Sequence, residues 1–160
     1  MEQMQQRLTP QQALPKAKIY CAYQERCHSE LKDKLYSFGL NKNEVEEIVS
    51  TLIEENFLNE ERFAIMFAGG HFRGKQWGKI KIAHALKQKQ VSPYCIKTAL
   101  QHIDADDYQL TLKKLLETKF ELLRAEKNKY TKKKKLLSYL LQRGFEMSLI
   151  NEALAAGDNY

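Results

Sequence analysis

A short apolar pattern recurs three times along this 160-residue chain, and it constrains the fold more than any other feature. Leu35 begins the first copy, Leu86 begins the second 51 residues later, and Leu140 begins the third after a further 54. In each copy an apolar residue follows the leucine by five positions, and two more follow that residue by five and nine. A supersecondary unit that returns at a fixed period indicates a tandem array. We therefore expect function on a face that the units share, rather than in a single pocket.

The composition favours helices over strands. Leu, Lys, Glu, Gln and Ala dominate, and these are strong helix formers. No segment shows the alternation of polar and apolar residues that is typical of a half-buried strand. Apolar residues make up 43% of the chain, which is enough for a buried core and argues against disorder throughout. We predict an all-α array of three three-helix repeats, at residues 13–58, 59–103 and 104–156, preceded by a flexible tail at residues 1–12.

Local signals place the helices of the first repeat. Pro15 suits the first turn of a helix. A second helix is expected over Cys27–Phe38, ended by Gly39 in a left-handed conformation. Asn41 is a suitable N-cap for the third helix, because Glu44 stands three residues later and completes a capping box.

Signals of the same kind continue through the other repeats. Ser92 and Pro93 begin a helix in the second repeat, Asp104 caps a long helix, and Asn128 precedes another. The glycine-dotted segment Gly69–Gly78 is predicted to connect two helices.

The same segment matches the G-x-x-x-x-G-K pattern of a nucleotide-binding P-loop, from Gly69 to Lys75. The residue that would bind Mg²⁺ is Gln76 instead of Ser or Thr. The preceding run has helical spacing, and no further parallel strands are predicted. We therefore favour a connection over a phosphate-binding loop.

Charge is distributed unevenly. Residues 1–70 contain 8 Lys and Arg against 11 Asp and Glu, whereas residues 71–160 contain 18 against 9. The basic C-terminal part favours contact with a polyanion or with a charged protein surface.

Basic residues recur at equivalent repeat positions. Lys79 and Lys81 fall on Lys133 and Lys135 at the offset of 54 residues, near the predicted start of a middle helix. We place Lys132–Lys135 in the first turn of its helix, where the helix dipole disfavours cations by roughly 0.3–1 kcal/mol each. A solvated helix face would also explain such a run. The crowding of like charges favours an anionic partner, for which phosphate contacts are the usual role.

The single tryptophan, Trp77, lies beside these positions together with Phe72 and Arg73. Its ring could stack on a base or enter a protein groove. It could equally fill the space between two helices.

Other function classes lack support in the sequence. The four histidines are on separate predicted helices or connections, and none has a paired nucleophile, so we expect neither an enzyme nor a cofactor. The three cysteines contain no Cys-x-x-Cys pair. A zinc site from Cys21, Cys27 and His28 has no familiar ligand spacing, so we favour reduced, packed cysteines. No segment has the length and apolarity of a membrane span or of a signal peptide, so we expect a cytoplasmic protein.

The chain resembles the RecX family, the bacterial regulators of the RecA recombinase. The likeness extends from about Leu14 to Leu154. The residues that carry it are Cys21–Leu31, Leu58–Ala64, Phe72 with Arg73, Trp77–Ile82, Leu86, Val91 with Ser92, Lys135, and Gly144 with Phe145. No single motif is diagnostic, but their order and spacing are specific.

The resemblance implies an elongated, curved row of three-helix units that lies in the groove of a RecA filament on single-stranded DNA. Such a protein would limit filament growth and lower recombinase, ATPase and co-protease activities. Separately, we expect this chain to be a monomer. The chain departs from the family pattern at Gly69 and Gly70, at Ala83 and His84, and at Gln90. These departures concern the details of the contact surface.

We therefore expect one basic surface to contact the filament or its DNA. The predicted contact residues are Arg73, Lys75, Trp77, Lys79, Lys81, Lys87, Lys132, Lys133 and Lys135. The alternative is a free-standing helical protein that binds nucleic acid without RecA.

Overall fold

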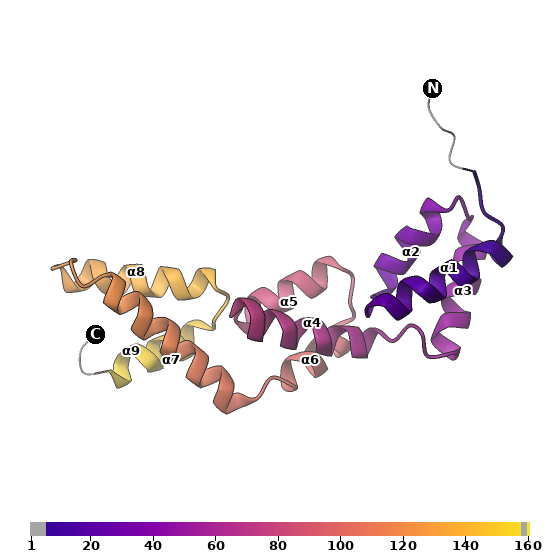
Figure 1. Ribbon diagram of the computed structural model, residues 1–160. Coiled ribbons are helices and arrows are strands. Elements are labelled where there is room, and N and C mark those ends of the chain that lie inside the picture. Colours follow the sequence, from indigo (N-terminus) through magenta and orange to yellow (C-terminus); the bar gives the residue numbers. More distant parts are fainter. Residues whose placement is uncertain (1–5, 158–159) are drawn as a thin grey trace, which may run out of the picture. The chain divides into compact units, whose positions relative to one another are not determined.

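The computed structural model consists of nine α-helices over the described residues, 6–157 and 160 (Figure 1). No strand occurs in this part of the chain, and the all-α prediction is confirmed. None of the described helices is both long and apolar enough to cross a lipid bilayer. The helices are α1 (Pro10–Tyr23), α2 (His28–Ser37), α3 (Lys42–Glu54), α4 (Glu60–Lys75), α5 (Lys79–Gln88), α6 (Pro93–Gln101), α7 (Ala105–Leu122), α8 (Lys129–Gln142) and α9 (Met147–Ala156).

The helices divide into two compact units. The first unit comprises the residues up to Met66 together with Leu86–Ile96, and the second comprises Phe67–Ala85 and Lys97–Tyr160. Helices α1, α2 and α3 therefore belong to the first unit, and α7, α8 and α9 belong to the second. Helices α4, α5 and α6 each contribute residues to both units, so the division crosses the predicted second repeat.

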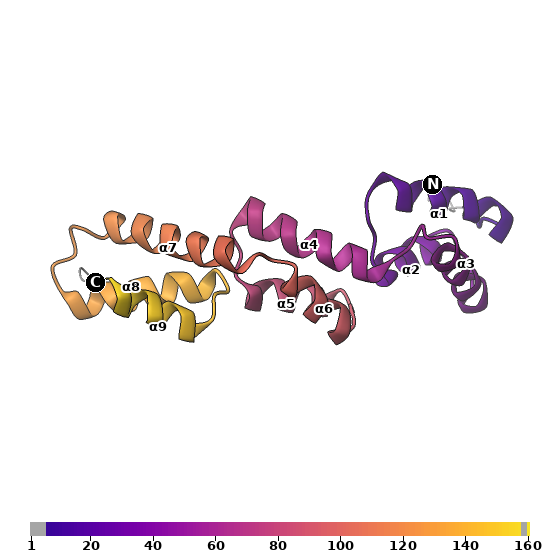
Figure 2. The same ribbon diagram turned by 90° about the horizontal axis from the view of Figure 1, so that it is seen from below.

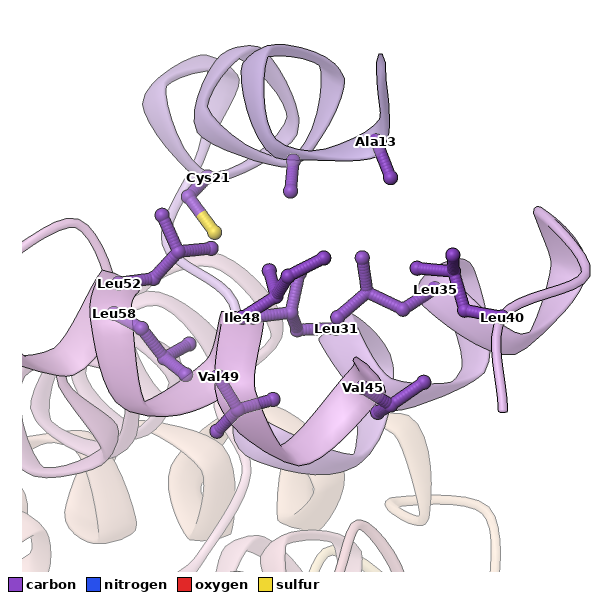
Figure 3. Packing of buried hydrophobic residues seen from close by; sticks show 11 residues of the cluster. Ala13, Cys21, Leu31, Leu35, Leu40, Val45, Ile48, Val49, Leu52 and Leu58 are labelled. Atoms are coloured by element: carbon purple, nitrogen blue, oxygen red, sulfur yellow. The ribbon is translucent and has the colours of Figure 1, made fainter. Parts of the chain in front are cut away.

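The core of the first unit lies between α1, α2 and α3 (Figure 3). Leu31 and Leu35 of α2 and Leu52 of α3 are completely buried there. Each such side chain stabilises the fold by about 1.5–3 kcal/mol relative to an exposed one. Ala13 and Ala17 are also completely buried, and their small side chains let α1 pack closely on this layer.

In the second unit, α7 packs against α8 and α9 (Figure 2). Three aromatic rings join these helices to the end of α4. Tyr108 lies between Phe72 and Phe145, with ring centroids 5.7 and 5.1 Å away. All three rings are buried.

The apolar repeat corresponds to one turn that the chain forms three times. Leu35, Leu86 and Leu140 are completely buried, each in the last turn of a helix. Four residues after each leucine the backbone has a positive φ, at Gly39 (84°), Gln90 (63°) and Gly144 (94°). The predicted left-handed end at Gly39 is confirmed. The same turn also forms at Gln90, where the residue is not glycine.

Helix α1 begins earlier than predicted. Thr9 is its N-cap, because the Thr9 side chain accepts a hydrogen bond from the Gln12 N–H (3.2 Å) and the Gln12 side chain accepts one from the Thr9 N–H (3.0 Å). Pro10 takes the first helical position, where a missing N–H has no cost. Pro15 is consequently inside the helix, and residues 10–12 are not part of a flexible tail. Residues 1–5 of that predicted tail lie outside the described residues.

The prediction of a connection over Gly69–Gly78 was wrong. Helix α4 continues through this segment to Lys75, and only residues 76–78 connect it to α5. Ala68 and Phe72 are buried on one face of α4, and this burial outweighs the cost of about 1 kcal/mol for each helical glycine. A phosphate-binding loop would precede a helix, whereas Lys75 is at a helix C-terminus, so the P-loop alternative is excluded.

The lysine run of α8 begins one turn later in its helix than predicted. Asn128 is the N-cap, with its side chain accepting a hydrogen bond from the Thr131 N–H at 3.2 Å. Lys129 is therefore the first helical residue, and Lys132–Lys135 lie in the second turn. The helix dipole acts mainly within the first turn, so it does not explain this run.

Within the first unit, the N-terminus of α2 contacts the turn between α5 and α6. The Ser29 hydroxyl donates a hydrogen bond to the Lys89 carbonyl oxygen at 2.6 Å. The Lys89 ammonium pairs with Glu30 at 3.3 Å, and Glu30 also accepts a hydrogen bond from the Cys27 N–H. Cys27, the N-cap of α2, is completely buried here. We call these contacts the first joint.

Within the second unit, the N-terminus of α5 makes the corresponding contact with the turn between α8 and α9. The Gly78 N–H donates to the Arg143 carbonyl oxygen (2.7 Å), and the Ile80 N–H donates to the Gly144 carbonyl oxygen (2.9 Å). A Cβ atom at Gly78 would lie 2.3 Å from the Gly144 carbonyl carbon. A Cβ atom at Gly144 would lie 2.3 Å from the Cβ of Lys81. We call this contact the second joint.

Candidate nucleic-acid interface

The turn between α4 and α5 positions the tryptophan. Gln76 takes a positive φ of 56°, and the Trp77 N–H donates to the His71 carbonyl oxygen at 3.3 Å. This geometry brings the Trp77 ring to 4.7 Å from the His71 ring, which itself stacks on Phe67 at 3.9 Å. Trp77 is half-buried. Its ring thus packs against α4, while part of the residue remains exposed.

Three cationic side chains surround this turn. The ammonium groups of Lys75 and Lys81 lie 5.3 and 4.8 Å from the centre of the Trp77 ring, within the range of cation–π attraction. The Arg143 guanidinium donates a hydrogen bond to the Lys75 carbonyl oxygen at 2.8 Å, which brings it beside the end of α4. We call Lys75, Trp77, Lys81 and Arg143 the Trp77 cluster.

The positive charge of the Trp77 cluster has no acidic partner among the described residues. No acidic side chain of the described residues lies within 4.0 Å of the charged groups of Lys75, Lys81 or Arg143. Lys75 and Lys81 are exposed. Such an unpaired group of cations beside an aromatic ring is suited to a phosphate backbone with unstacked bases.

A phosphate would meet side chains here rather than the free end of a helix. Lys79 and Lys81 occupy the first turn of α5, as predicted, but three of the N–H groups at that end already have partners. The Gly78 and Ile80 N–H groups are used by the second joint, and the Lys79 N–H donates to the Tyr108 hydroxyl at 3.0 Å. These three N–H groups are therefore not available to bind an anion.

Beneath the start of α5, Tyr108 links three elements. Its hydroxyl accepts the hydrogen bond from Lys79 and donates one to the Glu146 carboxylate at the start of α9. Burial of the Tyr108 phenol, together with its hydrogen bond to Glu146, raises the pKa of that group far above its ordinary value. Tyr108 therefore remains a hydrogen-bond donor at every physiological pH. Its hydroxyl connects the start of α5, which carries Lys81 of the Trp77 cluster, to the start of α9.

The other predicted contact residues lie in different surroundings. The Arg73 guanidinium folds back along α4 to Gly69, where a Cβ atom would lie 2.8 Å from it. The Lys79 ammonium lies 4.9 Å from the Tyr108 ring centre, and the Lys132 ammonium lies 3.9 Å from that of Phe120.

The remaining three predicted residues also have distinct environments. Lys135 pairs with Glu126 at 3.2 Å. Lys133 is exposed on α8, and Lys87 is exposed in the part of α5 that belongs to the first unit. Cation–π contacts therefore join Lys75 and Lys81 to Trp77, and among the described residues no ion pair, side-chain hydrogen bond or cation–π contact links the other six to these three.

Sequence reasoning missed Arg143. The sequence feature that could have identified Arg143 is its position directly before Gly144 in the third copy of the repeat. Gly144 is a residue of the second joint. A basic residue at that position is carried by the α8–α9 turn to the end of α4, although 68 residues separate Arg143 from Lys75.

Other kinds of site find no support among the described residues. No group of three His, Cys, Asp or Glu side chains is arranged to bind a metal ion there, so the zinc alternative with Cys21, Cys27 and His28 is not supported. The three cysteines are all free of disulfide bonds.

Comparison with known proteins identifies the relatives of this chain. Residues 59–100 match the family model described as RecX, second three-helix domain, and residues 106–154 match RecX, third three-helix domain. A regulatory protein RecX from Clostridium perfringens (strain 13 / Type A) is 33% identical over 127 residues, which cover 79% of this chain and 59% of that protein. One from Acinetobacter baylyi is 31% identical, over 81% of this chain and 78% of that protein.

A solved structure supports the same assignment of the fold. The crystal structure of RecX from Lactobacillus salivarius superposes with a TM-score of 0.86, at 21% identity, and covers 94% of this chain and 97% of that one. The chain spans only 59% of the length of the clostridial relative, so the activity of that whole protein does not transfer directly.

Proposed function

Since this chain belongs to the RecX family of regulatory proteins, we propose that it binds the RecA filament on single-stranded DNA and lowers the recombinase, ATPase and co-protease activities of that filament. The consequence would be regulation of recombination and DNA repair. The chain would act by occupying a surface, without chemistry of its own.

The observation that carries this proposal is the Trp77 cluster. Its three cations have no acidic partner among the described residues, and the ammonium groups of two of them lie within 5.3 Å of the ring centre of the half-buried Trp77. Lysine and arginine contact phosphates, while an aromatic ring stacks on bases without regard to sequence. This combination suits single-stranded DNA, whose bases are free to stack.

The remaining predicted contacts stay predictions. Lys87 and Lys133 are exposed and could extend the basic surface. Lys135 already pairs with Glu126, so a contact with DNA would have to replace that ion pair. Lys79 and Lys132 lie over aromatic rings, as Lys75 and Lys81 do.

A mobility-shift titration separates the proposed function from free-standing nucleic-acid binding. A fluorescent single-stranded oligonucleotide would be titrated with this protein, alone and as a preformed RecA filament. We expect the filament to bind at lower protein concentration than the naked oligonucleotide. Equal binding of both would favour the free-standing alternative.

Charge reversal tests the Trp77 cluster in the same assay. Lys75→Glu with Lys81→Glu should weaken filament binding, because two favourable phosphate contacts become repulsive. The matched control is Lys16→Glu with Lys32→Glu, an equal change of charge at exposed lysines of α1 and α2. Equal weakening by both pairs would mean that only net charge matters, and would remove the assignment of this cluster.

A further inference from the structure

A groove between α7 and α9 is a feature of the second unit that the proposed function does not use. Its volume is about 970 Å³, and it shares no residue with the Trp77 cluster. Apolar side chains form much of its lining, with Leu110 half-exposed and Leu116 buried beneath it. The apolar lining residues are Leu110, Leu116, Phe120, Ala153 and Ala156.

The charge of this groove is opposite to that of the whole chain. Its charged lining residues are Asp106, Lys113, Glu117, Glu121 and Glu152, so four carboxylates oppose one lysine, on a chain of net charge +6. Glu121 pairs with Arg124 at 3.2 Å. In the part of the chain that the structure describes, no cationic side chain lies within 4.0 Å of the other three carboxylates.

The groove already holds an aromatic side chain. The Tyr160 ring lies edge-on to Phe120 with 5.0 Å between ring centres, and it is so close to Gly157 that a Cβ atom there would lie 2.1 Å from the ring. Burial, and then the Glu117 carboxylate, raise the pKa of the Tyr160 hydroxyl. Tyr160 thus fills part of the groove beside Phe120, and four carboxylates and one lysine remain in the lining.

We propose that this groove binds a basic amphipathic helix of a protein partner. The apolar side of such a helix would pack on Leu110 and, in place of the Tyr160 ring, on Phe120, and its lysines or arginines would face Glu117 and Glu152. A surface between two helices suits a third helix with apolar residues at i, i+3, i+4 and i+7. Nucleic acid is repelled by the same carboxylates, so a cationic protein segment is the occupant that the charge favours.

The test uses the full chain and a synthetic peptide. The probe is a fluorescent peptide of about 18 residues with leucines at helical spacing and lysines at the remaining positions. A second peptide with glutamate in place of lysine is the control for charge. Fluorescence anisotropy should show binding of the lysine peptide and none of the glutamate peptide.

Variants locate the binding. Glu117→Lys with Glu152→Lys should weaken binding of the lysine peptide by roughly tenfold or more, since two attractive contacts become repulsive. Glu46→Lys with Glu47→Lys makes the same charge change at exposed positions of α3 and should have little effect. Thermal unfolding by circular dichroism verifies that the variants are folded.

Three results would overturn the proposal. They are no binding of the lysine peptide, an equal loss with both pairs of variants, and self-association of the free chain that Glu117→Lys with Glu152→Lys abolishes. The last result would assign the groove to a second copy of this chain. The proposal does not depend on the proposed function, because the groove variants leave the Trp77 cluster intact and should leave filament binding unchanged.

Discussion

The two joints make the same connection with different chemistry. The first joint is formed by side chains: the Ser29 hydroxyl donates to the Lys89 carbonyl oxygen, and the Glu30 carboxylate pairs with the Lys89 ammonium. The second joint is formed by backbone hydrogen bonds between the start of α5 and the α8–α9 turn. The two segments can come this close because Gly78 and Gly144 have no side chains. We therefore expect the two equivalent turns to tolerate different substitutions.

The residue at the left-handed position of each turn shows this difference. Gly144 cannot gain a side chain, since its Cβ would meet the Lys81 backbone and Cβ within 3.0 Å. At Gln90, in the first joint, a non-glycine residue adopts the same backbone conformation. At Gly39 an added Cβ would come within 3.0 Å of the flexible Arg7 side chain. Glycine at this position is thus a requirement of packing in the second joint, and not of the turn alone.

The largest effect is expected from Gly144→Ala. The change adds a methyl group that overlaps α5 and forces alanine to a φ of 94°, which together should cost roughly 3 kcal/mol of unfolding free energy. Urea unfolding followed by circular dichroism measures it. Gly70→Ala is the matched control, because nothing lies within 4 Å of the added Cβ, and it should be neutral or stabilising. Equal losses for the two variants would contradict the account of the second joint.

A second change removes a side-chain hydroxyl that lies beside the second joint, at the start of α5. Tyr108→Phe deletes one hydroxyl and leaves the Lys79 N–H and the Glu146 carboxylate without that partner, for an expected loss of about 2 kcal/mol. Tyr130→Phe is the control, because Tyr130 is exposed. A loss for Tyr108→Phe no larger than for Tyr130→Phe in urea unfolding would show that the hydroxyl adds nothing to the joint.

A smaller loss is expected in the first joint. Ser29→Ala removes one hydrogen bond to the Lys89 carbonyl oxygen, worth about 1 kcal/mol. Ser50→Ala, at an exposed position of α3, is the control for the loss of a hydroxyl. The comparison of the joints fails if Ser29→Ala costs as much as Gly144→Ala.

The smallest effect concerns pH. Burial of the Glu30 carboxyl favours its neutral form, but the hydrogen bonds from Cys27 and the ion pair with Lys89 outweigh this and hold its pKa below the ordinary value. A carboxylate whose pKa is lowered by folding stabilises the protein above its unfolded pKa, and this contribution disappears as the pH falls through the folded pKa. Glu30→Gln should therefore cost up to about 1 kcal/mol at pH 7, and the difference from the parent should shrink on acidification. A difference that is constant with pH would contradict this.

The sequence predicted the architecture well because its signals were local. The capping box of Asn41 and Glu44 and the left-handed end at Gly39 depend on residues only a few positions apart, and both are confirmed. The errors arose where two local signals competed. Helix α1 begins at Thr9 and Pro10, although Pro15 also suits a helix start. Helix α4 continues past its glycines because Phe72 is buried, although those glycines are typical of a helix end.

The candidate site was less accessible to sequence reasoning. Lys75, Trp77 and Lys81 are close in the chain, and their proximity could be anticipated. Arg143 joins them only through the second joint, a contact between residues more than sixty positions apart. The orientation of Arg73 towards Gly69 and the pairing of Lys135 with Glu126 depend on side-chain packing, which periodicity does not encode.

The most direct test of the proposed role of the Trp77 cluster is the DNA-dependent ATPase activity of RecA, measured with increasing amounts of this protein. The account predicts that the parent chain lowers the rate, that Lys75→Glu with Lys81→Glu largely abolishes this inhibition, and that Lys16→Glu with Lys32→Glu leaves it intact. An ATPase rate that the parent chain does not change, or inhibition that the Lys75 and Lys81 variant retains in full, would contradict it.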